Sequence, residues 1–237
     1  CIESVQWADE IIVIVDEKSN DKTEAIAQSF GIQVFKRPWE GYGGTKNFGL
    51  SRSTGEWILW LDADERVTPE LKRELLGVIK ENSESVKAYS IPRKAYFLGK
   101  WIKHCGWYPG YVLRVFQRTA GKFSDHKVHE RLDISGEMGY LRSDLLHYTD
   151  PNLFHYFEKF NRYTSLAADE LELQRYHFKL SDILIRPVWK FLQMYIVRAG
   201  FLDGIQGFIL CILSAGYVFS KYAKLWEKTR METNHEH

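Results

Sequence analysis

The N-terminal part of the chain alternates short apolar runs with segments of helical pattern. "DEIIVIVD", Asp9 to Asp16, predicts a strand buried on both faces, because β-branched residues fill it and polar residues close it. A helix ending at Gly31, a second strand, a second helix and a third strand follow in "DKTEAIAQSFG", "IQVFKRP", "TKNFGLSRSTG" and "EWILWLD". This order predicts an α/β fold whose mostly parallel sheet is flanked by helices.

The pattern changes twice further along the chain. "TPELKRELLGVIKE" predicts a helix with Thr68 as its N-cap and Pro69 in its first position. Residues 86–148 alternate short β patterns with aromatic turns and predict an antiparallel excursion. From Pro151 a long amphipathic helix is followed by two apolar segments separated by "RAGFLDG". We therefore expect a sheet domain over 1–150 and a helical extension over 151–237.

The helical extension has the composition of helices that lie in a membrane interface. Its longest uncharged run, Gly204 to Ser220, only reaches the lower edge of the ~17–25 residues that a spanning helix needs, so we do not expect a full span. Between Phe178 and Trp226, six basic residues and several aromatic residues accompany two acidic ones. The alternative is that these helices pack as core on the sheet domain, or on a second subunit in a homo-oligomer.

Overall charge and cysteine content exclude several classes of protein. Thirty-two basic residues against thirty-one acidic ones leave a net charge of +1, so the whole chain is not suited to nucleic acid. Cys1, Cys105 and Cys211 are too few and too far apart for a disulfide framework or a structural zinc site, which favours a reducing cytoplasm. The chain opens without a basic and apolar leader or an initiator Met, so we expect no signal peptide and a missing beginning.

The candidate chemistry lies where the third predicted strand ends, in "WILWLDADERVTPEL". Asp62, Asp64 and Glu65 follow an apolar run within four positions, and their mutual repulsion must be offset by a cation, by hydrogen-bond donors or by solvent. Alternation along the strand places Asp62 and Asp64 on one side. Such a pair suits Mg²⁺ or Mn²⁺ completed by phosphate oxygens. A solvated acidic loop is the alternative, because the Asp-x-Asp motif alone is weak.

Five stretches together make the sequence resemble the family 2 glycosyltransferases of the GT-A fold, and within them the branch that glucosylates the lipopolysaccharide inner core. They are "SVQWADEIIVIVDEKSNDKTEAIA", "GYGGTKNFGLSRSTGEWILWLDADERVTPEL", "GWYPGYVLRVFQR", "VHERL" and "HYTDPNLFHYFEKFNRYTSLAADEL". The resemblance covers nearly the whole chain. It implies a GT-A type, Rossmann-like α/β domain that binds a nucleotide-sugar.

The resemblance also implies roles for individual residues. A nucleotide-sugar site would comprise Asp16 at the nucleoside, Lys46 and Asn47 at the nucleotide or diphosphate, Asp62 at the ribose, and Arg114, with Arg118 beside it, at phosphate or acceptor. Asp64 would bind the metal with His147, and Glu130 would be the catalytic base. Each residue also has an ordinary structural reading. Glu130 could form a surface salt bridge, His147 could be a hydrogen-bonded core histidine, and Lys46 could be solvated on a helix face.

Two departures from the family pattern concern the nucleoside end of the expected site. The family's first strand would precede Cys1, so the sheet as given lacks an inner strand. After Asp16 the chain has Glu17-Lys18-Ser19 where the family prefers a central glycine, which predicts a different turn beside the nucleoside.

The expected function is an inverting transfer of a hexose, such as glucose from UDP-glucose, to a heptose of a lipid-linked saccharide. The enzyme would require Mg²⁺ or Mn²⁺ and would lie on the cytoplasmic face of the inner membrane, where such an acceptor is found. The alternatives are a non-catalytic protein that binds sugar nucleotides, and a related transferase that acts on a polyprenyl phosphate or a protein. No nucleic-acid partner is expected.

Overall fold

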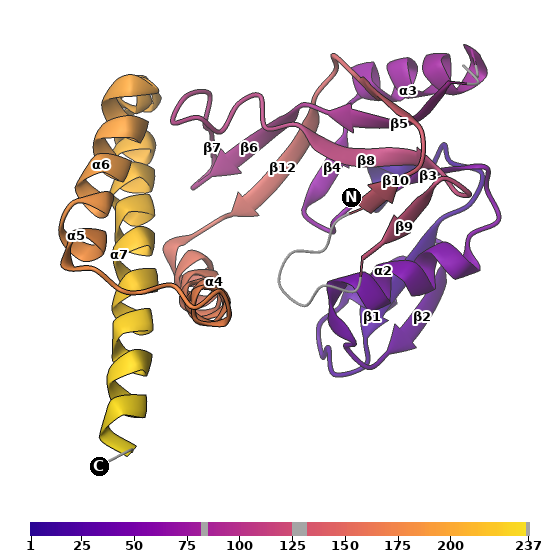
Figure 1. Cartoon of the computed structure of the whole chain (residues 1–237). Coiled ribbons are helices and arrows are strands. Elements are labelled where there is room, and N and C mark those ends of the chain that lie inside the picture. The colour runs from indigo at the N-terminus through magenta and orange to yellow at the C-terminus, as the bar shows by residue number, and fades with distance from the viewer. Residues whose placement is uncertain (82–84, 125–131, 236–237) are drawn as a thin grey trace. The chain divides into compact units, whose positions relative to one another are not determined.

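The computed structural model describes residues 1–81, 85–124 and 132–235, and Figure 1 shows the elements in chain order. Two compact units divide the chain. The N-terminal unit holds residues 1–93 and 111–147, and the C-terminal unit holds residues 94–110 and 148–237. Residues 94–110, which precede the boundary expected at 150, thus belong with the helices.

The first strands of the N-terminal unit form a parallel pair, and the first of them ends at Asp16. Its first elements are a 3₁₀ turn, two strands and two helices: η1 (Ile2–Val5), β1 (Ile12–Asp16), α1 (Thr23–Ser29), β2 (Gln33–Arg37) and α2 (Gly41–Arg52). β1 and β2 pair in parallel, as the sequence pattern predicts. α2 packs closely on β1, because a Cβ placed on Gly49 would lie 2.6 Å from Ile14 Cδ1. A larger residue at this helix position would therefore have to displace the Ile14 side chain.

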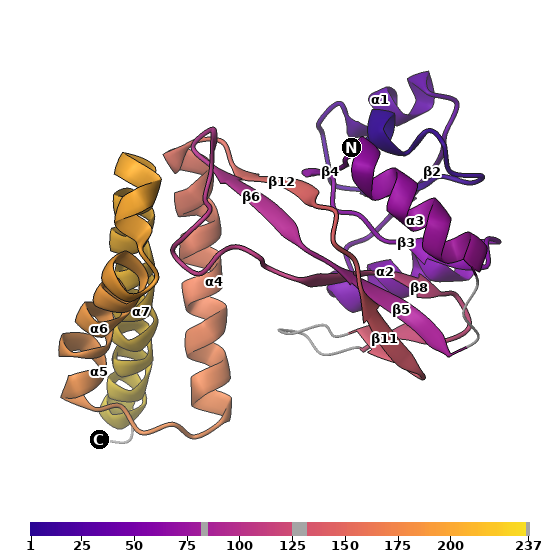
Figure 2. The same cartoon turned by 90° about the horizontal axis from the view of Figure 1, so that it is seen from above.

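A four-stranded sheet in the order β11-β5-β8-β3 carries much of this unit's core. Its strands and the helix that packs on it are β3 (Trp57–Leu59), β5 (Val86–Ile91), β8 (Val112–Gln117), β11 (Glu137–Tyr140) and α3 (Pro69–Glu81). Leu71 and Leu75 of α3 pack with Ile91 and Val115, and Figure 2 shows α3 running beside β5. α3 begins at Pro69, as predicted.

Two short antiparallel pairs complete the N-terminal unit. They are β4 (Glu65–Val67) with the first half of β12 (Leu145–Asp150), and β9 (Gly121–Phe123) with β10 (Leu132–Ile134). β8 is antiparallel to both β3 and β5. The antiparallel excursion predicted after residue 86 is therefore part of this sheet. β1–β2 and β5–β11 pair in parallel. β12 also runs alongside β6 in the same direction, since the Leu145 N–H donates to the Pro92 carbonyl oxygen and the Leu98 N–H donates to the Asp150 carbonyl oxygen. The α/β class is confirmed, with less parallel pairing than the strand and helix order predicts.

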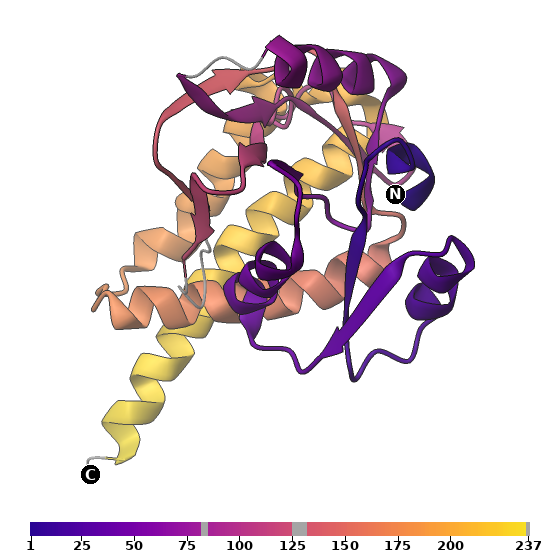
Figure 3. The same cartoon turned by 90° about the vertical axis from the view of Figure 1, so that its right-hand side faces the viewer.

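The C-terminal unit packs a strand and loop segment onto a group of helices. Its elements are β6 (Arg93–Phe97, without Arg93), β7 (Lys100–Trp101), α4 (Leu153–Leu173), α5 (Leu180–Leu184), α6 (Arg186–Leu192), the π-helix η2 (Gln193–Val197), the 3₁₀ helix η3 (Gly200–Asp203) and α7 (Gly204–His235). Phe97 and Ile102 pack with Met194, Leu210 and Cys211. Figure 3 shows α4 crossing α7. Segment 94–110 is therefore part of the helical core.

One helical stretch of the described chain, Gly200–Arg230, is long and apolar enough to cross a membrane by length and composition. It extends beyond the uncharged run singled out in the sequence. Its most apolar window is 22% buried, and much of the rest is half-buried within this unit.

Candidate active site

The three carboxylates follow β3 closely. Asp62 and Asp64 lie in the short turn before β4, and Glu65 is the first residue of β4. The Glu65 backbone N–H donates to the Asp62 carbonyl oxygen at 3.0 Å, and the Asp62 N–H donates to Glu65 Oε2 at 3.1 Å. The Glu65 side chain is fully buried, whereas those of Asp62 and Asp64 are 44% and 36% exposed. Glu65 therefore holds the turn from inside, and the two aspartates remain accessible.

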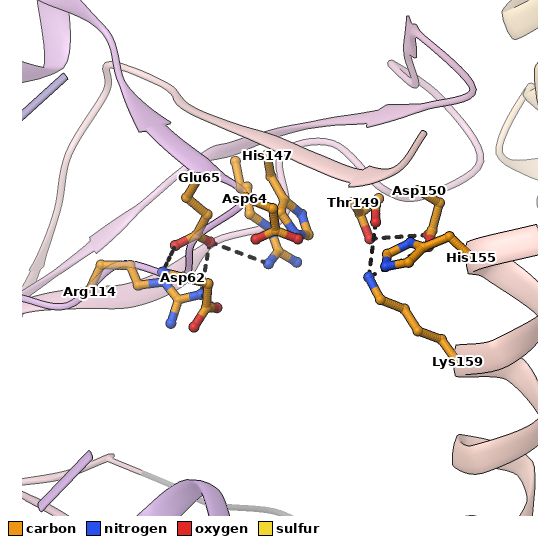
Figure 4. A network of polar contacts seen from close by, with 10 residues as sticks. Asp62, Asp64, Glu65, Arg114, His147, Thr149, Asp150, His155 and Lys159 are labelled. Atoms are coloured by element: carbon orange, nitrogen blue, oxygen red, sulfur yellow. Dashed lines mark hydrogen bonds and ion pairs between the residues drawn. The ribbon is translucent and has the colours of Figure 1, made fainter. Parts of the chain in front are cut away.

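Arginine side chains balance two of these three charges (Figure 4). Arg114 Nη2 donates to Glu65 Oε1 at 2.8 Å and also to Asp62 Oδ2. Arg93 Nη1 lies 3.8 Å from Glu65 Oε1. Burial lowers the pKa of Arg114, but the charges of Glu65 and Asp62 outweigh burial and raise it above its ordinary value. Burial also lowers the pKa of Arg93, against the charge of Glu65.

Asp64 faces His147 (Figure 4). Asp64 Oδ2 lies 3.2 Å from His147 Nε2, and the register of β12 on β4 places His147 opposite Glu65. The His147 side chain is 14% exposed. The structure thus brings together the two residues that the sequence assigns to the metal.

A carboxylate oxygen beside an imidazole nitrogen fits Mn²⁺ or Mg²⁺ as a pair of protein ligands. His147 Nδ1 is buried without a hydrogen-bond partner among the described residues, and Nε2 is the ring nitrogen that faces Asp64. The described residues contain no cluster of three or more histidine, cysteine or acidic side chains suited to a metal. Diphosphate oxygens would therefore have to complete the coordination, which is usual for Mg²⁺.

Asp16 organises the turn after β1. Its Oδ1 accepts a hydrogen bond from the Lys18 N–H at 3.1 Å, and its carbonyl oxygen accepts one from the Ser19 N–H at 2.9 Å. The chain therefore closes this turn with the Asp16 side chain, although it lacks the glycine that the family prefers there. Binding of a nucleoside by Asp16 stays a prediction.

Lys46 and Asn47 lie on α2 and have different surroundings. Lys46 is buried, with Nζ 5.2 Å from the Trp60 ring centroid and 5.4 Å from that of Phe123, so the solvated helix face is wrong. Asn47 Nδ2 donates to the Phe123 carbonyl oxygen at 2.8 Å, and its Oδ1 accepts from the Phe123 N–H at 3.0 Å. The Asn47 amide thus fixes α2 to β9.

Glu130 and Arg118 are the two remaining candidates. Glu130, the predicted catalytic base, lies outside the described residues. Arg118 Nε donates to the Gly55 carbonyl oxygen at 3.0 Å, on an exposed part of the surface. Its contact is therefore with the loop before β3.

A second polar cluster in Figure 4 belongs to the C-terminal unit. Thr149 Oγ1 donates to Asp150 Oδ2 at 3.1 Å, and Lys159 Nζ donates to the Thr149 carbonyl oxygen at 2.9 Å. His155 Nδ1 lies 3.4 Å from Asp150 Oδ1. These contacts join the end of β12 to the first turns of α4.

Sequence reasoning missed the central role of Glu65 and did not identify Arg93. A weak signal was present, because Arg93 follows "SIP" at the start of a short strand pattern, next to Lys94. A buried carboxylate requires such a partner. The pairing of Arg114 with Glu65 depends on β8 lying beside the acidic turn, which no local pattern specifies.

Comparison with known proteins identifies the family of the chain. Residues 1–148 match the family model described as "Glycosyl transferase family 2". A lipopolysaccharide core biosynthesis glycosyltransferase, LpsC of Rhizobium meliloti (strain 1021), is 32% identical over 96% of this chain and 86% of its own length. An uncharacterized glycosyltransferase of Rickettsia typhi is 27% identical over 98% of this chain and 83% of its own length.

Among solved structures, S. aureus TarS 1-349 covers 98% of this chain and 86% of its own, with a TM-score of 0.44 and 14% identity. The family model extends over more than half of the chain and includes the Asp62–Glu65 turn and His147. The chain therefore belongs to glycosyl transferase family 2.

Proposed function

We propose that this glycosyltransferase transfers a hexose, with glucose from UDP-glucose as the first candidate, to a heptose of a lipid-linked saccharide with inversion at the anomeric carbon. The relative named for lipopolysaccharide core biosynthesis supports this acceptor class. The observation that carries the proposal is the pairing of Asp64 with His147 beside carboxylates already balanced by arginines.

Charge arithmetic in the acidic turn supports a site for one metal-bound diphosphate. Asp62, Asp64 and Glu65 carry three negative charges, and Arg93 and Arg114 carry two positive ones, so one negative charge remains. A Mg²⁺ or Mn²⁺ ion held by Asp64 and His147 would supply charge stabilisation to the departing phosphate.

The transfer itself requires a base but no covalent nucleophile. The acceptor oxygen forms a bond to the anomeric carbon while the bond from that carbon to the diphosphate oxygen breaks with its electron pair. The acceptor proton passes to a carboxylate, a service worth roughly 10²–10⁴-fold in rate. Glu130 is the residue that we assign to this step.

The remaining predicted residues would hold the donor. Asp62 is 44% exposed and is fixed by Arg114. It would accept hydrogen bonds from the ribose hydroxyls. Arg114 therefore acts on the nucleotide-sugar through Asp62. We assign Asp16 to the nucleoside and Lys46 and Asn47 to the diphosphate side, with Asn47 acting through the α2–β9 contact.

The acceptor class places the enzyme on the cytoplasmic face of the inner membrane. A lipid-linked saccharide is confined to that surface, so a bound enzyme meets it at a high effective concentration. The exposed apolar side chains of Gly200–Arg230, among them Phe201, Leu202 and Ile205, support peripheral association through the C-terminal unit.

Replacement of the metal-binding carboxylate tests this function. Asp64→Ala should abolish hexose transfer to a lipid-linked heptose acceptor while its circular dichroism and thermal unfolding match the wild type, because the carboxylate is 36% exposed. Asp9→Ala, which removes an exposed acidic residue elsewhere in the N-terminal unit, is the matched control. Near-normal turnover by the Asp64 variant would overturn the proposal.

A further inference from the structure

The turn between α6 and α7 exposes an unusual amount of apolar surface. Five large apolar side chains within ten residues are each at least half exposed: Ile196, Val197, Phe201, Leu202 and Ile205. Soluble monomers rarely leave apolar patches of this kind uncovered. The turn therefore requires a non-aqueous neighbour.

Segment 94–110 is fixed to this turn by one buried carboxylate. Asp203 Oδ2 accepts the His104 N–H at 2.8 Å, and Asp203 Oδ1 accepts the Lys103 N–H at 3.2 Å. Lys100 Nζ donates to the Asp203 carbonyl oxygen at 2.7 Å. The loop after β7 and the apolar turn therefore form one preorganised surface within the C-terminal unit.

The segment joined to the turn is strongly basic. Residues 94–110 contain three lysines and no acidic residue. Lys94 Nζ and Lys103 Nζ lie 4.8 and 5.9 Å from the Trp101 ring centroid, so charge and aromatic surface are combined. Arg198, exposed at the turn, lies against Gly106, where no side chain would fit.

Several basic residues of the helices are engaged within the unit. Arg186 Nε donates to Asp182 Oδ1 at 2.7 Å, and Lys228 pairs with both Asp169 and Glu172. Lys224 Nζ donates to Asn161 Oδ1 at 2.8 Å. Attraction to anionic lipid therefore depends less on the helices than the sequence suggests.

We propose that the apolar turn 196–205 and the basic segment 94–110 form a membrane-docking face that binds anionic lipid bilayers. Phe201, Leu202 and their neighbours enter the acyl boundary, while Lys94 and Lys103 lie at the headgroup phosphates with Trp101 between them. Apolar residues inserted beside aromatic and basic ones are the composition that interfaces require. The inference deepens the proposed function, because it identifies how the enzyme reaches a lipid-linked acceptor.

Vesicle sedimentation of the full chain tests the face. Lys94→Gln/Lys103→Gln should bind phosphatidylcholine vesicles with about 30% phosphatidylglycerol about 25-fold more weakly, because each lysine near such a surface contributes about fivefold. Binding to pure phosphatidylcholine should be unchanged for this variant. Phe201→Ser/Leu202→Ser should weaken binding to both kinds of vesicle by more than about tenfold.

A charge-matched control separates this face from overall charge. Lys22→Gln/Lys80→Gln removes two exposed lysines of the N-terminal unit and should leave vesicle binding unchanged. Equal losses for both lysine pairs, or wild-type binding by the Phe201 and Leu202 variant, would overturn the proposal. A dimer that this serine variant converts to monomers, without lipid binding by either, would instead make the face an interface between copies.

Failure of the docking face and failure of the proposed function give different results. Asp64→Ala should keep full vesicle binding while it loses transfer. The docking variants should keep transfer to a heptose acceptor freed of its lipid. Loss of that soluble transfer in a docking variant would overturn the assignment of these residues to lipid alone.

Discussion

At the residue scale, the site rests on one buried carboxylate with two arginine neighbours. Glu65 contacts Arg114 at 2.8 Å and the Asp62 N–H at 3.1 Å, so it organises both the charge and the backbone of the acidic turn. A buried ion pair adds little net stability compared with an apolar core, but removal of one partner leaves the other charge buried and alone. Glu65 is therefore required for folding as well as for the site.

Removal of this carboxylate should be costly. Glu65→Ala is expected to lower the free energy of unfolding by about 3–5 kcal/mol, because Arg114 would keep only Asp62 as a charged partner. Urea unfolding followed by far-ultraviolet circular dichroism measures the change. If the alanine variant does not fold, Glu65→Gln, which keeps the side-chain volume, should show a smaller loss of the same sign.

The exposed pair Glu70 and Arg73 provides the control. Their side chains meet at 3.2 Å on the surface of α3, where Glu70→Ala should change stability by no more than about 0.5 kcal/mol. Equal effects at Glu65 and Glu70 would show that the buried network does not hold the turn.

The sequence predicted some of this network and not the rest. Asp62 and Asp64 were identifiable because a strand ends in an Asp-x-Asp pattern, and His147 because it matches a family motif. Arg114 was identified with a different contact, since its role depends on β8 passing beside the turn. Lys46 was open to a solvated reading because helical periodicity alone does not show that Trp60 and Phe123 cover it.

At the element scale, α3 is fastened to the loop before β12 through Glu74. Glu74 Oε1 accepts the Arg142 N–H at 2.8 Å, and Oε2 accepts the Ser143 N–H at 2.7 Å. Partial burial by itself raises the pKa of Glu74, but the hydrogen bonds from Ser143 and Arg142 outweigh it and lower the pKa. The helix after the acidic turn is thus held to the strand that carries His147.

This contact should give stability a pH dependence. A folded pKa below the unfolded value means that Glu74 stabilises the fold above pH 4.5 and loses this effect as the pH falls through its folded pKa. Glu74→Gln should therefore be less stable than wild type at pH 7. The two proteins should be about equally stable at a pH low enough to protonate the wild-type Glu74 carboxyl in both its folded and its unfolded state. Urea unfolding across this range measures the difference, and a gap that persists at low pH would contradict it.

The packing of α7 on segment 94–110 should protect two thiols. Cys105 Sγ and Cys211 Sγ lie 3.7 Å apart in the core, and burial raises the pKa of both thiols. We therefore expect Cys1 to react first with a thiol reagent at pH 8, and Cys105 and Cys211 only after denaturation. Mass spectrometry of partly modified protein identifies the order. Early modification of Cys211 would show that α7 does not pack as described.

Sequence periodicity was informative for elements and less so for their assembly. The start of α3 at Pro69 and the β1–β2 pair followed from local signals. The assignment of residues 94–110 to the helical unit did not, because it rests on the packing of Phe97 against helices far along the chain and on the hydrogen bond from the His104 N–H to Asp203. Such long-range contacts leave no local periodicity to detect.

At the scale of the whole molecule, charge is local rather than global. The net charge of +1 provides little attraction to an extended polyanion, which needs several phosphate contacts at physiological salt. We expect no detectable binding of single-stranded RNA under conditions in which anionic vesicles are bound. Fluorescence anisotropy of a labelled oligonucleotide measures it, and micromolar binding would point to a nucleic-acid function that the account excludes.

The central claim is that Asp64 and His147 hold a metal-bound nucleotide-sugar. Isothermal titration of UDP-glucose into the chain, with Mn²⁺ and then with EDTA, tests it most directly. The account predicts binding with Mn²⁺ that disappears with EDTA and in Asp64→Ala, and that survives in Asp9→Ala. Binding of equal strength with EDTA or in Asp64→Ala would show that the acidic turn is not the metal site, and absence of binding under every condition would contradict the donor.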